Sequence, residues 1–332
     1  MSSAAEERRT AEISVIIPSY NSGATILGCL ESLYTQTVLP KEVIIVDSSE
    51  DNTVEIIKVH YPEVRVIVYD HRIFPGPARN HGVQEAKSPV VAFIDADCLA
   101  DPAWIENIEA RHADGHMIVG GAIEPADMDD AVAWAAHLYE FREFSPVGES
   151  RTVIHIPTCN ISYQRDLFLE HEGFPNAYYP QEDLLFNYLL GMYGHEVWFD
   201  PAILVRHYAR SNLRDCLSHL HRIGRVTRCT LAQLDLPGSF IGRSAFLSFV
   251  MSPALGAVKF LRAFVAMVRV YPGIMMRHPS LIVNLVLGII WWTRGFAAGA
   301  TTQLSGIRGW GGLEDPIIDK LASKMSEQRG EN

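Results

Sequence analysis

Residues 90–98 read Val90-Val91-Ala92-Phe93-Ile94-Asp95-Ala96-Asp97-Cys98, an apolar run that ends abruptly in two carboxylates. A continuous apolar run of this kind is typical of a strand that is buried on both faces. An unpaired buried charge is costly, so two carboxylates at such a strand end need a physical reason. At alternate strand positions both side chains would point to the same side. There they could offer hard oxygen ligands to Mg²⁺ or Mn²⁺, and such a metal usually bridges to substrate phosphates. The alternative is a loop that is acidic but binds no metal.

The segments before this run alternate between strand and helix patterns. Strands are predicted at residues 13–17 and 43–46, and a helix over residues 26–34, where apolar residues recur with a 3.6-residue period. Such alternation predicts a largely parallel sheet with crossover helices, and ligands bind beyond the carboxyl ends of its strands. The polar residues at these predicted strand ends are Tyr20, Asn21, Asp47, Asp95 and Asp97. We therefore expect them to form one site.

Four motifs, taken in order, resemble those of the family 2 glycosyltransferases. They are Val15-Ile16-Ile17-Pro18-Ser19-Tyr20-Asn21, the strand end Val46-Asp47-Ser48-Ser49, the segment from Gly76 to Gly82, and Asp95-Ala96-Asp97. The resemblance covers residues 12–210 and is more specific than any single motif. It implies the GT-A fold, an α/β architecture with a Rossmann-like, mixed and mostly parallel sheet. It also implies transfer of a sugar from a nucleotide diphosphate with inversion at the anomeric carbon.

The resemblance further implies how the nucleotide-diphospho-sugar donor is bound. Asp47 is expected to accept a hydrogen bond from uracil or its equivalent, which makes a UDP-sugar the expected donor. Ser48 stands where the family often has a second Asp, so base recognition departs from the family pattern here. The alternatives are ordinary turn chemistry for Pro18 and, for Arg79, a surface cation paired with a carboxylate. The residues expected to contact the base or diphosphate are Pro18, Tyr20, Asn21, Asp47, Arg79 and Asn80.

A divalent metal, Mg²⁺ or Mn²⁺, is the cofactor that the resemblance implies. Asp97, supported by Asp95, would hold this metal on the diphosphate. In many GT-A enzymes a His near position 207 completes the metal or diphosphate site, so His207 is a third candidate, with a structural role as the alternative. Asn160 lies in a stretch that resembles the acceptor side of the family's pocket. It would contact donor sugar or acceptor, or else cap a turn.

Inverting transfer needs a group that takes the proton of the acceptor hydroxyl, and a carboxylate serves. Residues 180–191 predict a buried helix with Glu182 and Asp183 in its first turn. The helix dipole favours acidic residues there in any case. The family has its Glu-Asp pair at this point. The resemblance therefore implies that Asp183 is the catalytic base and that Glu182 orients it or binds the acceptor.

Charge is distributed very unevenly along the chain. The whole chain carries a net charge of −11, yet residues 206–308 contain 13 Lys or Arg and only two acids, so this segment is +11 and the remainder −22. Residues 213–234 read as a basic amphipathic helix, which usually marks an anionic membrane surface or a phosphate-bearing partner. Nucleic acid is not an expected partner, because aromatic residues are sparse among these cations. Five scattered cysteines and a polar N-terminus indicate reduced thiols and no signal peptide.

The residues that follow are strongly apolar. Two segments, 245–268 and 281–300, carry few charges, although their uninterrupted runs fall short of the roughly 18–20 residues of an easy membrane crossing. Lys259 and Arg262 share one helical face and could snorkel. The pattern predicts two membrane-associated helices, either a spanning hairpin or a re-entrant pair. A soluble helical subdomain or a dimer interface is the alternative.

The sequence therefore predicts a membrane-associated enzyme on the cytoplasmic face of the cell membrane. We interpret it as an inverting, metal-dependent glycosyltransferase that extends a polyprenyl-diphosphate-linked saccharide in cell-envelope or exopolysaccharide synthesis. A polyprenyl-phosphate monosaccharide synthase and an inactive membrane scaffold of the same family are the alternatives. The predicted segments are a flexible N-terminus (1–11), the GT-A domain (12–210), the basic amphipathic helix (211–238), the membrane-associated helices (239–312) and a polar tail (313–332).

Overall fold

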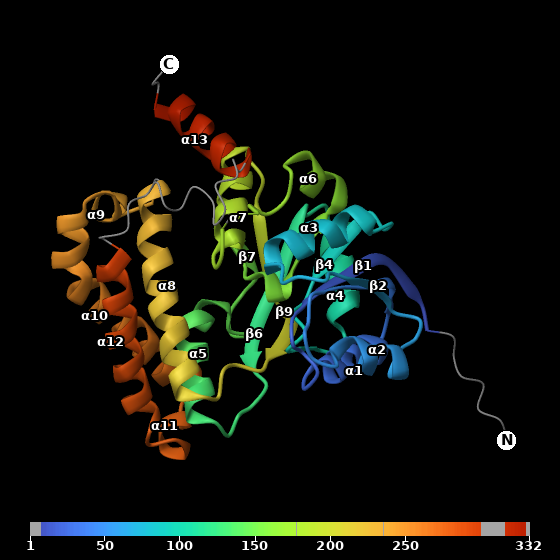
Figure 1. Ribbon diagram of the computed structural model, residues 1–332, viewed down its shortest axis with the longest axis horizontal. Coiled ribbons are helices and arrows are strands. Elements are labelled where there is room, and N and C mark those ends of the chain that lie inside the picture. Colours follow the sequence, from blue (N-terminus) through green and yellow to red (C-terminus); the bar gives the residue numbers. More distant parts are fainter. Residues whose placement is uncertain (1–7, 177, 235, 300–315, 330–332) are drawn as a thin grey trace. The chain divides into compact units, whose positions relative to one another are not determined.

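The computed structural model describes residues 8–332 apart from residues 177, 235, 300–315 and 330–332. The chain forms two compact units, each assembled from several segments (Figure 1). Unit 1 comprises residues 1–123, 148–173 and 193–206, and unit 2 comprises residues 124–147, 174–192 and 207–332. The predicted N-terminal residues 1–7 and the end of the apolar segment from residue 300 lie outside the described residues.

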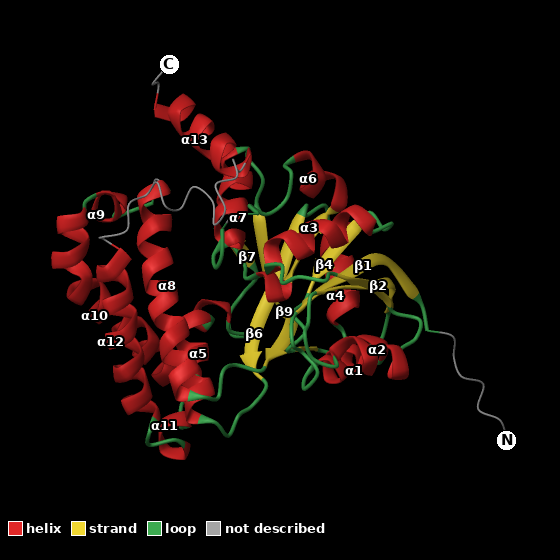
Figure 2. Ribbon diagram, in the orientation of Figure 1, coloured by secondary structure: helices red, strands yellow, loops and turns green. Residues whose placement is uncertain are grey.

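Unit 1 is built on a mixed sheet with helices packed against it (Figure 2). The strands are β1 (Thr10–Ser19), β2 (Leu39–Asp47), β3 (Arg65–Val68), β4 (Val90–Phe93), β5 (Cys98–Ala100), β6 (Ile118–Pro125), β7 (Arg151–Val153), β8 (Ile161–Gln164) and β9 (Val197–His207). Their order is β3-β2-β1-β4-β8-β6-β9-β5, and β7 pairs with β9. The first four strands are parallel, whereas β8 is antiparallel to both β4 and β6. The predicted mixed, mostly parallel architecture is confirmed.

Short crossover helices connect the parallel strands. They are α1 (Ile26–Tyr34), α2 (Thr53–His60) and α3 (Pro75–Glu85), and the unit also contains α4 (Trp104–Ala113), α6 (Arg165–Glu170) and the 3₁₀ turn η2 (Thr158–Asn160). Proline at the first helical position starts α3, where its missing N–H costs no hydrogen bond. Gly82 lets α3 lie directly on β1, because a Cβ there would be 2.4 Å from Ile16 Cγ2. This close approach fixes the part of α3 that reaches the strand ends.

Unit 2 is almost entirely helical in its described residues (Figure 2). Its elements are α5 (Ala131–Glu140), η1 (Arg142–Phe144), α7 (Glu182–Met192), α8 (Leu213–Gln233), α9 (Ser239–Arg243), α10 (Ala245–Val270), α11 (Ile274–Arg277), α12 (Leu281–Gly299) and α13 (Pro316–Arg329). Helices α5, α8, α10 and α12 share a core that includes Trp134, Tyr139, Leu220, Leu285 and Trp292, all buried. The two predicted apolar helices are present as α10 and α12, and by length and composition alone each is long and apolar enough to cross a membrane.

The units do not follow the linear boundaries that the sequence suggests. Residues 124–147 and 174–192 lie within the predicted GT-A segment, but they cluster with the C-terminal helices. The polar tail contains a regular helix, α13, whose buried residues Ile317, Leu321 and Met325 pack with Leu185 and Leu189 of α7. The helix carrying the predicted base therefore has its core in unit 2.

Candidate active site

The carboxyl ends of β1, β2 and β4 meet at one edge of the sheet. Strand β1 pairs in parallel with β2 on one side and with β4 on the other, and Ser19 lies opposite Asp47. The chain connection reverses direction at β1, which is where open parallel sheets bind ligands. Pro18 follows the predicted strand 13–17, but it lies inside β1 opposite Val46, one residue before the strand ends.

The loops after β1 and β2 are joined by hydrogen bonds around Asn21 and Asp47. The Asp47 carboxylate is fully buried and accepts two bonds from Ser49, one from its N–H at 2.9 Å and one from its hydroxyl at 2.7 Å. Asn21 has a left-handed backbone (φ 52°), and its side-chain oxygen accepts the N–H of Glu50 at 2.9 Å. The Asn21 N–H in turn donates to the Ser49 hydroxyl at 2.7 Å. The two predicted base-binding residues thus shape one preformed loop pair.

Tyr20 presents its ring to a cation that the sequence analysis did not single out. The Arg72 guanidinium lies 4.3 Å from the centroid of the Tyr20 ring and 6.0 Å from that of Phe74. Arg72 lies in the loop after β3, and Ile73 of that loop donates its N–H to the Ser48 hydroxyl at 3.3 Å. Nothing in the local pattern distinguishes Arg72 from other loop cations, because only the fold brings it to Tyr20.

Arg79 forms a buried ion pair with Asp95. Its Nη2 donates to Asp95 Oδ1 at 2.5 Å, and the exposed fractions of the two side chains are 3% and 30%. The alternative that the sequence left open for Arg79 was a surface cation paired with a carboxylate; the pairing is present, but Arg79 is buried, and its contact with the base or diphosphate stays a prediction. The neighbouring Asn80 lies against the chain at Gly173, where a Cβ would be 2.4 Å from Asn80 Oδ1. Arg79 of α3 therefore holds the acidic segment in place, and Asn80 packs on the chain at Gly173.

The two carboxylates of the acidic motif lie in a turn and not on a strand. Strand β4 ends at Phe93, and the Cys98 N–H donates to the Asp95 carbonyl at 3.0 Å to close the turn. The expectation that strand alternation aligns Asp95 with Asp97 is therefore wrong. Instead, Asp95 faces Arg79, and Asp97 belongs to a different cluster.

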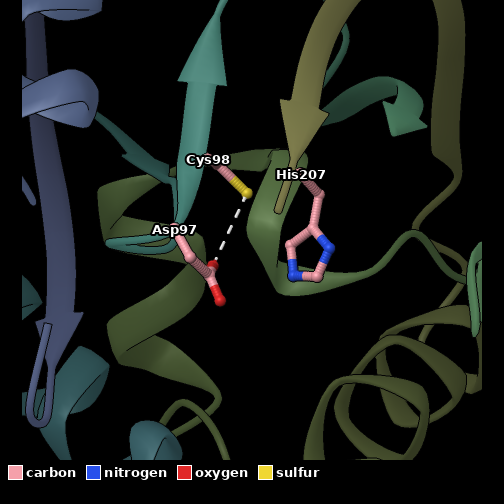
Figure 3. Close-up of side chains that lie close together, drawn as sticks. All are labelled: Asp97, Cys98 and His207. Atoms are coloured by element: carbon pink, nitrogen blue, oxygen red, sulfur yellow. Dashed lines mark hydrogen bonds between the residues drawn. The ribbon is translucent and has the colours of Figure 1, made fainter. Parts of the chain in front are cut away.

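That cluster contains Asp97, Cys98 and His207, whose potential ligand atoms all lie within 4.8 Å of one another (Figure 3). The sheet produces this proximity, because β5 begins at Cys98 and its neighbour β9 ends at His207. Burial raises the pKa of the Cys98 thiol well above its usual value, and Mg²⁺ and Mn²⁺ prefer oxygen ligands. Asp97 and His207 are thus the better donors, and one carboxylate with one imidazole could contribute ligands to a divalent metal.

The side chain of Asn160 makes its hydrogen bonds to groups inside the protein. Its side chain is fully buried, accepts the Trp104 indole N–H at 2.8 Å, and donates to the carbonyls of Ala122 and Ile203 at 2.7 and 2.8 Å. These bonds connect α4, β6 and β9. They favour a structural role for Asn160, and a contact with sugar or acceptor stays a prediction.

Glu182 and Asp183 occupy the first turn of α7, as the sequence predicts. Glu182 is buried, whereas Asp183 is partly exposed and accepts the Leu184 N–H at 2.8 Å. The residue before them anchors the helix: Gln181 accepts the Thr230 hydroxyl at 2.7 Å and donates to the Thr227 hydroxyl at 3.2 Å, both on α8. The sequence analysis missed this anchor, because the spacing between positions 181 and 230 carries no periodic signal.

Comparison with known proteins gives these residues a context. The family model described as Glycosyl transferase family 2 matches residues 14–171. Glycosyltransferase AglE of Haloferax volcanii is 28% identical over 222 residues, which is 64% of this chain and 72% of AglE. The O-antigen chain rhamnosyltransferase RfbN of Salmonella typhimurium is 28% identical over 59% of this chain and 66% of its own length.

Other relatives match over shorter stretches. The uncharacterized glycosyltransferase YibD of Escherichia coli is 44% identical over 105 residues, which is 30% of either chain. Among solved structures, a mannosyltransferase of Pyrobaculum calidifontis in complex with GDP-Man and Mn²⁺ has a TM-score of 0.54 at 16% identity, covering 84% of this chain and 86% of its own. At that identity the likeness concerns the fold alone.

Proposed function

We propose that the chain is an inverting, metal-dependent glycosyltransferase, and the match of the Glycosyl transferase family 2 model to residues 14–171 supports this proposal. Its donor in this proposal is a nucleotide-diphospho-sugar, with a UDP-sugar favoured by the buried Asp47 at the end of β2. The observation that carries the proposal is the meeting of Asp97 with His207, next to a turn held by Arg79.

The donor diphosphate would bind where Asp97 and His207 offer ligand atoms for a divalent metal. When bound, such a metal stabilises the negative charge that develops on the leaving diphosphate. Arg79 pairs with Asp95 and holds it in place, which fixes the turn that carries Asp97. The loops tied by Asn21 and Ser49 would receive the nucleotide base without reorganising.

Asp183 is the proposed catalytic base. Its carboxylate would take the proton of the acceptor hydroxyl while that oxygen attacks the anomeric carbon and the bond to the diphosphate breaks, which inverts the configuration. Buried Glu182 would keep the first turn of α7 in place, and the anchoring of Gln181 to α8 would limit its motion. A polar neighbour beneath the base is the usual way to hold it in one orientation.

The proposed acceptor is a saccharide linked to polyprenyl diphosphate at the cytoplasmic leaflet. The two apolar helices α10 and α12 support this part, because a soluble acceptor would require no such segment. The printed name of the relative RfbN concerns an O-antigen chain, which is consistent with cell-envelope saccharide synthesis.

The test separates chemistry from binding. In Asp183→Asn we expect transfer from a labelled donor to fall by about 10²–10⁴-fold, while the thermal shift produced by nucleotide sugar and Mn²⁺ is retained. In Asp97→Asn the Mn²⁺-dependent part of that shift should disappear. Asp101→Asn is the control, because this carboxylate is four residues away, pairs with Arg206 at 3.7 Å and accepts the Ala103 N–H at 3.4 Å.

Normal transfer by Asp183→Asn would contradict the base, and an unchanged Mn²⁺ effect in Asp97→Asn would contradict the metal site. Supplying polyprenyl monophosphate and polyprenyl-diphosphate saccharide separately distinguishes the extending enzyme from a monosaccharide synthase. Transfer to either acceptor excludes an inactive scaffold.

A further inference from the structure

Helix α10 exposes an apolar face along its length. Phe246 and Phe249 are 73% and 67% exposed. Soluble proteins rarely leave a continuous apolar surface of this kind without a partner. We call this face the α10 stripe, and its exposed members are Phe246, Phe249, Val250, Val258, Leu261, Val265 and Val268.

Cations border the stripe on one side. At about 100° per residue, Arg262 and Arg269 fall next to each other around the helix, directly beside the apolar positions. Both are exposed, and Arg262 pairs with Glu143 of η1 at 2.6 Å. Lys259 does not snorkel outwards, as the sequence suggested it could, because its Nζ donates to the Tyr139 carbonyl at 3.0 Å near the end of α5. An apolar face with an Arg margin is the pattern of helices that lie in a membrane interface.

Helix α12, the second apolar helix, is enclosed by its neighbours. It packs between α10 and α8, which lie side by side with it (Figure 1). The contact with α8 is close: a Cβ at Gly295 would be 2.0 Å from the His221 carbonyl, and one at Gly224 would be 2.2 Å from the Trp292 carbonyl. The outer side of α8 is charged, with Arg222 exposed in the same stretch.

This arrangement opposes a crossing of the bilayer by α12. If α12 spanned the membrane, Arg222 of α8 would be carried into the hydrocarbon beside it, since it is exposed and follows His221, which contacts Gly295; Arg225 lies beside Gly299, at the end of α12. Each Arg at the centre of a bilayer costs about 2.5–3.5 kcal/mol on insertion scales. The bundle as a whole is amphipathic: α10 is its apolar side and α8 its basic side.

We propose that the α10 stripe docks onto one leaflet of an anionic phospholipid membrane and lies in its plane, without crossing it. Charge complementarity supports this partner, because residues 206–308 carry a net charge of +11 in a chain whose remainder is −22. Lipid would cover the apolar side chains, while the bordering Arg residues would contact lipid phosphates. The proposal concerns attachment only and does not depend on transferase activity.

Binding of the purified full chain to vesicles tests the surface. We expect flotation with vesicles of phosphatidylcholine and phosphatidylglycerol, weaker flotation with phosphatidylcholine alone, and loss of binding in high salt. The double variant Phe249→Glu/Leu261→Glu should reduce the floating fraction by about tenfold or more, because two exposed apolar groups become charged. Val59→Glu is the matched control, since Val59 is 74% exposed but lies on α2 of unit 1. Unchanged flotation of the double variant would overturn the docking surface.

Cysteine labelling tests the topology independently. All five native cysteines are buried, so an introduced cysteine reports its own position. In inside-out vesicles from cells that produce the chain, Ser280→Cys between α11 and α12 should react with an impermeant maleimide as readily as Val59→Cys does. Labelling of Ser280→Cys only after the vesicles are permeabilised would show a spanning hairpin and overturn the in-plane arrangement. Neither measurement uses a sugar donor, so a failure here is distinct from a failure of the proposed function.

Discussion

Each unit buries a carboxylate beside a basic side chain, but the two pairs have different surroundings. In unit 1, Arg79 is almost completely enclosed, whereas the partner Asp95 keeps 30% of its side chain exposed in the turn after β4, at the edge proposed to bind the donor. In unit 2, His219 and Glu140 lie 3.2 Å apart and are only 10% and 15% exposed, between α8 and α5. The first pair fixes a turn that a ligand can reach, and the second joins two helices inside a bundle.

The difference indicates what a buried charge does in each unit. Taking two ions out of water is expensive, and the attraction between them often repays little more than that cost. In unit 1 the Arg79–Asp95 pair lies at the turn that carries Asp97, so we expect it to affect donor binding as well as stability. In unit 2 it should matter for stability alone.

Replacing Arg79 should produce the largest loss of stability among the predicted variants. Arg79→Met leaves Asp95 without its cation in a mostly buried position, and we expect unfolding free energy to fall by about 4 kcal/mol. The metal-dependent thermal shift with nucleotide sugar should be lost too. Arg65→Met is the matched control, because Arg65 of β3 forms an exposed pair with Glu85, which lies on α3 like Arg79. This substitution should lower the unfolding free energy by less than about 1 kcal/mol. Equal losses in chemical denaturation would show that burial of the Arg79 pair has no special effect.

The sequence analysis could predict only those candidate site residues that follow the ends of predicted strands. Asn21, Asp47 and Asp97 follow predicted parallel strands, and parallel strands place their carboxyl ends together whatever the side chains are. The pairing of Arg79 with Asp95 could not be predicted, because it depends on how closely α3 lies on β1, which Gly82 permits. His207 was found through family resemblance, and the pairing order of β5 and β9 explains its position.

Unit 2 was harder to predict, because helices show which face is apolar but not which helix covers it. The charged tail gave no sign that Ile317 and Leu321 of α13 would pack on α7. Lys259 could have pointed to lipid or to protein, and its bond to the Tyr139 carbonyl depends on where α5 ends. Long-range helix contacts of this kind have no local sequence signal.

Removing the unit 2 carboxylate should produce a pH-dependent effect. Burial alone would raise the pKa of Glu140, but His219 and Arg210 outweigh it and lower that pKa to about 2, from 4.5. Because the folded pKa is below the unfolded one, the stabilisation is complete above about pH 4.5 and is lost as the pH falls towards 2. Glu140→Gln should therefore cost about 3 kcal/mol at pH 7 and progressively less below pH 4.5.

Donor binding by Glu140→Gln should equal that of the unchanged chain, in contrast to Arg79→Met. Unfolding followed by denaturant at several pH values measures the first expectation, and the Mn²⁺-dependent thermal shift measures the second. A pH-independent difference, or a loss of donor binding, would show that the Glu140 pair does not act only as a structural contact.

The smallest expected effect concerns the anchor of α7. The Thr230 hydroxyl is buried and joins two groups of the segment before the helix, the Tyr178 hydroxyl at 2.9 Å and Gln181 Oε1 at 2.7 Å. Thr230→Val keeps the shape but leaves these groups without that partner, so we expect a loss of about 1–2 kcal/mol in unfolding free energy. Thr37→Val, which removes an exposed hydroxyl bonded to Glu106, should stay within about 0.5 kcal/mol. If the two variants are equally stable in denaturant, the Thr230 hydroxyl of α8 does not hold the predicted base helix, and the apolar cluster around Leu185 and Leu189 positions α7 instead.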